Sequence, residues 1–220
     1  MVQKLTPLHK ALNLWAVILI IWSVYRAYFR TDLPIWIDEF IAKPLVFILP
    51  IYIYISRFEK KNFFEDIGLK LNNLVSNIVL GVGIGLVFFI SGGLGLILKS
   101  KDVFSVFNNL GFYSIIFFFT ISLVTSISEE VLSRGFVLKR MYEDSKNMFT
   151  AIFLSSILFF FLHVPILFAS DKMTGFLLLR VMFSDLILSL AVSFIYLEKR
   201  NLTLPIAIHS FYNLSLYFFL

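Results

Sequence analysis

The chain has 220 residues, of which 59% are hydrophobic, and its mean hydropathy is +0.89. This composition excludes a soluble domain and indicates an all-α polytopic membrane protein, because backbone polar groups in lipid must be satisfied within their own segment. The chain has no cysteine, which excludes disulfides and thiolate metal sites. The net charge of +5 fits cytoplasmic loops and anionic headgroups, so we expect no nucleic-acid partner.

Seven apolar stretches are each long enough to cross a membrane as a helix. They are predicted at residues 11–29, 35–56, 74–98, 112–141, 148–168, 176–197 and 204–220. We expect one integral membrane domain, with an N-terminal region (1–110) that holds the first three helices and a core (111–220) that holds the other four. The amphipathic interval 57–73 is predicted to lie along the membrane surface.

The second stretch carries charges and two prolines within an apolar helix. Glu39 and Lys43 are four residues apart, so they share a face and can pair. Two interpretations are open for this pair: a self-paired helix end at the membrane interface, which we favour, and the lining of a polar cavity. Pro44 and Pro50 predict a kink or a local widening of the helix.

The third stretch is rich in glycine, and Gly81 and Gly85 form a G-x-x-x-G pattern. Small residues at this spacing allow two helices to approach closely. We expect this face to pack against another helix of the same chain rather than to form a dimer.

The distribution of Lys and Arg predicts the orientation in the cell membrane. With the N-terminus in the cytoplasm and the C-terminus outside, eleven cations lie in inside segments and four lie in outside segments. The inside set is Lys4, Lys10, Arg57, Lys60, Lys61, Lys70, Lys139, Arg140, Lys146, Lys199 and Arg200. The outside set is Arg30, Lys99, Lys101 and Lys172.

The fourth stretch contains two adjacent acids, Glu129 and Glu130, followed by Arg134. A charged side chain at the bilayer centre costs about 2.5–3.5 kcal/mol on insertion scales, so an ionisable group there suggests function. Glu130 and Arg134 are four residues apart and can pair. Glu129 is rotated by about 100° from Glu130, so we expect it to be free to act on a different neighbour.

Two of the three histidines, His163 and His209, lie inside the fifth and seventh apolar stretches. His209 shares a helix face with Asn213, as His163 does with Phe159. Counting from the turn between the fourth and fifth helices places Glu129 about five residues short of the level of His163. Tilt or a kink is therefore needed to bring these side chains into one site.

A carboxylate, two imidazoles and an amide could activate a water and stabilise an oxyanion, and so cut an amide bond. The set Glu129, His163 and His209 could instead hold a divalent metal such as zinc. The H-E-x-x-H pattern of helical zinc proteases is absent from the sequence.

Three motifs, in this order, carry a family resemblance: Glu129-Glu130-x-x-x-Arg134, Phe159-x-x-x-His163 and His209-x-x-x-Asn213. They resemble the motifs of the CAAX-processing and bacteriocin-processing family (CPBP, also called Abi) of intramembrane endopeptidases. The resemblance covers residues 111–220, whereas the first half matches only as a helical membrane region.

The resemblance implies an enzyme that hydrolyses a peptide bond of a membrane-associated peptide or protein near the membrane surface. Glu129 would be the general base, acting with His163 on the attacking water, and His209 with Asn213 would form the oxyanion hole. Glu130 and Arg134 would orient the helix, and Phe159 would pack beside His163.

The family's eukaryotic members cleave prenylated C-terminal motifs, and its bacterial members are linked to peptide maturation and bacteriocin immunity. It is labelled metal-dependent, yet its site is also described as glutamate-driven, and we favour a site without a tightly held metal. Two alternatives remain for this chain. It could be a non-catalytic immunity or scaffold protein that binds a partner in the same polar pocket, or a small transporter. The transporter is less favoured, because the paired broken spans of repeat-built transporters are missing.

Overall fold

The computed structural model describes residues 6–29, 33–98, 110–167 and 175–219. The regular structure of these residues is entirely helical, which confirms the predicted all-α class. Several positions used in the sequence predictions fall outside the described residues: Lys4, Arg30, Lys99, Lys101, Phe168, Lys172 and Leu220.

The first two spans contain several π-helical segments, denoted η. The first span is α1 (Pro7–Val24) followed by η1 (Tyr25–Phe29). The second span joins five short elements: α2 (Ile35–Ile37), η2 (Asp38–Ala42), η3 (Pro44–Ile48), α3 (Leu49–Ile53) and η4 (Tyr54–Glu59). Proline lacks an N–H and its ring clashes with the carbonyl four residues earlier, and the π-helical segments on either side of Lys43 provide the local widening predicted at Pro44.

The remaining elements follow in chain order. They are α4 (Phe63–Asp66), α5 (Leu74–Ile97), α7 (Phe112–Glu130), η5 (Val131–Leu138), α8 (Lys139–Ser145), α9 (Met148–Leu167), α10 (Gly175–Lys199) and α11 (Thr203–Phe219). Six helices in the described part of the chain are long and apolar enough to cross a membrane, with α7, η5 and α8 forming one of them. The last helix, α11, has 17 residues and extends along the same bundle, so about seven spans are present.

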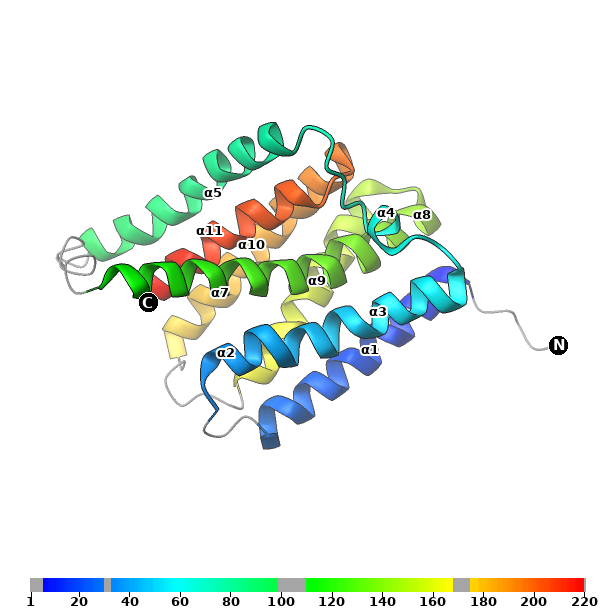
Figure 1. The fold of residues 1–220 in the computed structure, drawn as a ribbon, viewed down its shortest axis with the longest axis horizontal. Helices are drawn as coiled ribbons and strands as arrows, with labels where there is room; N and C mark the ends of the chain where they lie inside the picture. The colour runs from blue at the N-terminus through cyan, green and yellow to red at the C-terminus, as the bar shows by residue number, and fades with distance from the viewer. Residues whose placement is uncertain (1–5, 30–32, 99–109, 168–174, 220) are drawn as a thin grey trace.

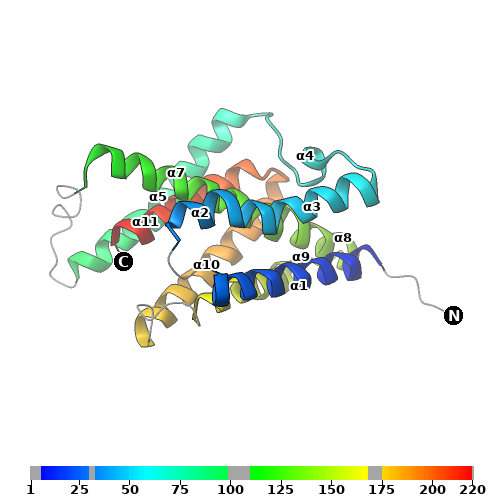
Figure 2. The ribbon, with the colours of Figure 1, turned by 60° about the horizontal axis from the view of Figure 1, so that its bottom comes forward.

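The helices form two layers (Figure 2). One layer holds α1, α9 and α10, and the other holds the second span, α7, α11 and α5. In Figure 1, α1 begins and α11 ends at opposite ends of the bundle, as an odd number of spans requires. The elements that carry the predicted site therefore come from both layers.

The glycine-rich face of α5 packs against α11, as predicted. A Cβ atom added at Gly81 would lie 2.5 Å from the Cβ of Ala207, and one added at Gly85 would lie 2.7 Å from the Cβ of Phe211. Side chains at these glycines would force the two helices apart. The G-x-x-x-G face therefore holds α11 in place within the chain.

The fourth span has 34 residues from Phe112 to Ser145. At 1.5 Å per residue it is about 50 Å long, which exceeds the roughly 30 Å hydrocarbon core of a bilayer. Its far end is charged, and Lys139 and Arg140 donate hydrogen bonds to Asp66 at 2.8 and 3.0 Å. Burial acts to raise the pKa of Asp66, but the hydrogen bond from Lys139 and the charge of Arg140 outweigh it and lower the pKa below its ordinary value.

Candidate active site

The acid–arginine pair predicted in the fourth span is present at the centre of the bundle. Arg134 Nη1 donates to Glu130 Oε1 at 2.9 Å, and both side chains are buried. Arg134 Nη2 also donates to the hydroxyl and the carbonyl oxygen of Ser189 in α10, at 2.9 and 3.3 Å. These bonds satisfy a buried guanidinium and tie η5 to α10 in the opposite layer.

Phe159 lies between the arginine and the two histidines. The guanidinium of Arg134 stands 4.4 Å from the centre of the Phe159 ring, which is a cation–π contact. The same ring lies 4.8 Å from the ring of His163 and 5.7 Å from that of His209, centre to centre. One buried aromatic side chain in α9 thus fixes the spacing of three polar ones.

His209 connects the two glutamates. Its Nδ1 donates to Glu130 Oε1 at 2.7 Å, because an ionised carboxylate can only accept. Its Nε2 is then directed at Glu129 Oε2, 3.5 Å away. Glu130 therefore orients the imidazole toward the other acid.

His163 also faces Glu129, despite the offset in depth expected from the sequence. His163 Nε2 lies 3.8 Å from Glu129 Oε2, and its Nδ1 lies 3.1 Å from the carbonyl oxygen of Phe159. The two side chains therefore approach each other although the residue count places them at different depths. Both imidazole–carboxylate separations exceed an ordinary hydrogen bond, so a bridging water is the arrangement to expect between these groups.

Glu129 faces neighbours other than Glu130, as expected, but the part of the expectation that left it without a charged partner was wrong. Its Oε1 accepts a hydrogen bond from Lys43 Nζ at 2.8 Å, and Lys43 also pairs with Glu39 Oε2 at 2.8 Å. Thr125 in α7 donates to that same Glu39 oxygen at 2.6 Å. A carboxylate in a low-dielectric interior needs a compensating charge, and the second span supplies it.

The favoured interpretation of Glu39 and Lys43 as a helix end at the interface was also wrong. The two residues pair, but they are only 6% and 7% exposed and lie against Glu129. The alternative interpretation, the lining of a polar cavity, is the correct one.

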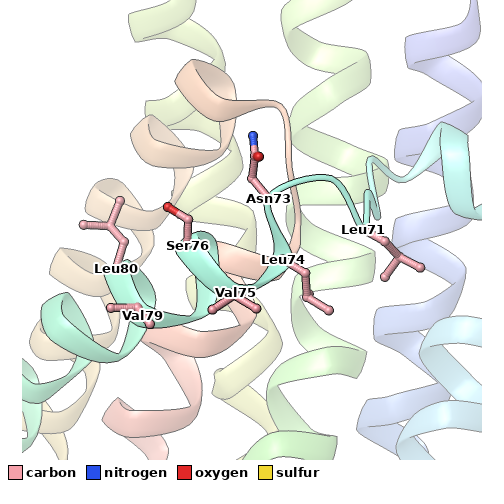
Figure 3. A pocket seen from close by; sticks show the side chains of 7 residues that line it. All are labelled: Leu71, Asn73, Leu74, Val75, Ser76, Val79 and Leu80. Atoms are coloured by element: carbon pink, nitrogen blue, oxygen red, sulfur yellow. The ribbon is translucent and has the colours of Figure 1, made fainter.

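That cavity has a volume of about 80 Å³, which is room for water. Charged and aromatic side chains dominate its wall: Trp22, Arg26, Glu39, Lys43, Phe47, Glu129, Leu162 and His163. A second, wider hollow lies beside the start of α5 (Figure 3). Its lining is apolar except for Asn73 and Ser76, so it offers no acid or base for hydrolysis.

Asn213 lies on the same face of α11 as His209 and is buried. Its Nδ2 donates to Ser126 Oγ at 3.1 Å, and Ser126 is three residues before Glu129 on α7. The amide is thus held against the helix that carries the two acids. A side-chain amide has two N–H groups, so one remains for another acceptor.

The donor set around Glu129 is unfavourable for a bound metal ion in two respects. In the part of the chain that the structure describes, no group of three His, Asp or Glu side chains is arranged to hold a metal ion. The Lys43 ammonium also occupies one oxygen of Glu129, where it would repel a dication.

Lys43 and Glu39 are the site residues that sequence reasoning did not select. The signal was present in the sequence, because charges inside an apolar span are as costly in the second helix as in the fourth. Lys43 and Glu129 are 86 residues apart in the sequence, and their proximity depends on how the two helices that carry them pack. Spacing along the chain does not determine this packing.

Comparison with known proteins agrees with the geometry. Residues 111–215 match the family model described as type II CAAX prenyl endopeptidase Rce1-like. No curated protein and no solved structure gives a significant match. The matched residues contain the three motifs that resemble the CPBP family, with Glu129, His163 and His209 at their centre. Residues 111–215, just under half of the chain, therefore carry the sequence pattern of the Rce1-like family, which is consistent with the resemblance to the CPBP family.

Proposed function

We propose that the chain is an endopeptidase that hydrolyses a peptide bond of a membrane-associated peptide or protein with a water activated by Glu129. The observation that carries this proposal is the convergence of Glu129 Oε2 with the Nε2 atoms of His163 and His209, at 3.8 and 3.5 Å. A cavity large enough for water adjoins Glu129 and His163.

The reaction begins with a water held between Glu129 Oε2 and His163 Nε2. Glu129 accepts a proton from this water while the water oxygen attacks the carbonyl carbon of the substrate. The resulting tetrahedral intermediate carries its negative charge on the former carbonyl oxygen. Glu129 then gives the proton to the amide nitrogen, the C–N bond breaks, and a carboxylic acid and an amine are released.

His209 and Asn213 are the proposed donors to the oxyanion. Because Nδ1 of His209 already donates to Glu130, a second donation from Nε2 requires the imidazolium form. The side-chain amide of Asn213 contributes its remaining N–H. Fixed donors in a site that excludes bulk water stabilise developing charge strongly, and removing one donor typically costs about 10²–10³ in kcat.

The depth of the site favours a substrate that is itself in the membrane. Glu129 lies ten residues before Lys139, or about 15 Å at 1.5 Å per residue, from the charged end of the fourth span. We propose that the substrate brings its scissile bond to this depth, either as a C-terminal CAAX-type motif or as a peptide processed in maturation or bacteriocin immunity.

The test compares Glu129→Ala with Glu143→Ala in purified protein reconstituted into lipid vesicles with a library of membrane-associated peptides. Glu143 is an exposed acid in α8, at the end of the same span, so it controls for loss of charge. We expect Glu129→Ala to lower cleavage by about 10²–10⁴-fold and Glu143→Ala to leave it unchanged. Full cleavage by a folded Glu129→Ala protein would contradict the proposal.

A comparison of membrane peptides from cells with the wild-type chain, with Glu129→Ala and with neither would then identify the substrate. If no peptide differs and Glu129→Ala still protects cells or binds a partner, the chain is a non-catalytic binding protein.

A further inference from the structure

The second span contributes a charged side chain directly to the site. Its Lys43 donates to Glu129 Oε1 at 2.8 Å, although the matched family region begins only at residue 111. In both views of the bundle the second span runs alongside α7 (Figures 1 and 2). Resting on the proposed function, we infer that Lys43 is a positioning residue that fixes the carboxylate of Glu129 for its work as the base.

The two oxygens of Glu129 have separate partners. Oε1 is bound to Lys43, whereas Oε2 faces the imidazoles of His163 and His209. A glutamate side chain has three rotatable bonds, so without a partner on Oε1 its carboxylate would sample several rotamers. With Lys43 in place, one oxygen is anchored and the other is left for water.

Lys43 is itself held tightly enough to serve this purpose. Its ammonium also pairs with Glu39 Oε2 at 2.8 Å, and that oxygen accepts from Thr125 Oγ1 at 2.6 Å. The ammonium lies 5.9 Å from the centre of the Trp22 ring, so the ring covers another side of the ammonium. The lysine side chain is 9% exposed, so water does little to loosen these bonds.

A series of contacts links the second span, in the N-terminal half of the chain, to α7 in the C-terminal half. Thr125 and Glu129 are four residues apart on α7, and both reach Lys43, one through Glu39 and the other directly. The lysine is therefore fixed to the same helix face that carries the base. A shift of the second span would move Glu129 Oε2 relative to the two histidines.

The test uses Lys43→Met and Lys43→Arg in the full chain, with kcat and KM measured on a peptide that the wild-type protein cleaves. Lys139→Met is the matched control, because Lys139 Nζ also lies 2.8 Å from a carboxylate, that of Asp66, outside the site. Unfolding temperature and elution profile are recorded for every variant.

We expect Lys43→Met to lower kcat by about 100-fold while KM changes by less than about 2-fold, because misplacing a reacting group by about 1 Å can cost that much. Lys43→Arg should recover part of the loss, to within about 10-fold of the wild-type kcat, since it restores a charged donor with a different reach. Lys139→Met should leave kcat unchanged.

Three results would overturn the inference: a wild-type kcat in Lys43→Met, equal loss in Lys43→Met and Lys43→Arg, or a rise in kcat. A rise in kcat would show that the ion pair between Lys43 and Glu129 restrains the base instead of positioning it. If Lys43→Met does not fold, Lys43→Arg decides: a kcat within about 10-fold of wild type with an unchanged KM supports positioning, and a loss of about 100-fold or more contradicts it.

These results are distinguishable from failure of the proposed function. If the wild-type protein and Glu129→Ala cleave equally, the proposed function fails. If Glu129→Ala is inactive and Lys43→Met retains full kcat, only the role of Lys43 fails.

Discussion

Glu130 and His209 share a 2.7 Å hydrogen bond that joins α7 to α11 in the middle of the bundle. The accepting oxygen, Oε1, also receives the bond from Arg134, whereas Oε2 of Glu130 has no hydrogen-bond partner among the residues that the structure describes. Glu130 therefore compensates the charge of a buried guanidinium and sets the direction of an imidazole. The two adjacent glutamates differ in kind: Glu130 holds the structure around the site, and Glu129 faces the proposed water.

Replacement of the buried Glu130 should destabilise the protein far more than replacement of the exposed Glu143. Glu130→Ala leaves Arg134 buried without its carboxylate, and breaking such a pair costs about 3–5 kcal/mol. Glu143→Ala, at an exposed position in α8 of the same span, should stay within about 0.5 kcal/mol of wild type. Denaturant unfolding in detergent measures both. Equal stability of Glu130→Ala and Glu143→Ala would contradict the assignment.

The packing of α5 on α11 predicts opposite effects at two neighbouring glycines. A Cβ at Gly81 would lie 2.5 Å from Ala207 Cβ, so Gly81→Ala should destabilise the protein by about 1–3 kcal/mol. A Cβ at Gly83 meets no atom of the described residues within 4 Å, so Gly83→Ala should be neutral or stabilising by up to about 1 kcal/mol. Thermal unfolding of the two variants checks this. A lower unfolding temperature for Gly83→Ala would refute the packing.

The ion network at Asp66 predicts a dependence of stability on pH. The pKa of Asp66 is lowered below its ordinary value of 3.8: burial opposes this shift, but the bond from Lys139 and the charge of Arg140 outweigh it. A lowered folded-state pKa means that the ionised group stabilises the fold above pH 3.8 and that this stability is lost as the pH falls through the folded-state value.

Asp66→Asn should therefore cost about 1–3 kcal/mol near neutral pH. The difference from wild type should be constant well above pH 3.8 and shrink as the pH falls below that value, because the carboxylate of the unfolded chain then takes up a proton before that of the folded protein. Unfolding temperatures measured across this range test the sign. A difference that grows on acidification would contradict it.

The orientation of the chain remains a prediction and can be tested without removing any native thiol, because the sequence has no cysteine. Leu33 lies in the first predicted outside loop and Asp144 at an inside turn, and both are exposed. We expect Leu33→Cys to react with a membrane-impermeant thiol reagent on intact cells, and Asp144→Cys only after permeabilisation. The reverse pattern would invert the topology.

The helices and the polar motif were predictable because their signals are local. Apolar runs longer than a bilayer is thick specify spans, and the i,i+4 spacing of Glu130 and Arg134 specifies a pair that the structure confirms. The expectation that Gly81 and Gly85 face another helix of the chain was confirmed for the same reason, since small residues at that spacing create one flat face.

The environment of Glu129 was not predictable because it is set by packing between distant segments. Helical geometry showed that Glu129 points away from Glu130, but not that Lys43 lies at the position it points to. Counting residues from a turn also misjudged depth, since it ignores side-chain reach and the π-helical segment η5 directly after the two acids. Such segments are rare and occur often at functional sites.

The ion pair between Lys43 and Glu129 has a practical consequence for protein engineering. Residues 111–215 alone would match the family model, yet a fragment cut there would lack the ammonium that neutralises Glu129. Its buried carboxylate would have to become neutral or draw water into the bundle, and either change would alter the base. A chimaera that keeps the motif helices should therefore also keep the native second span.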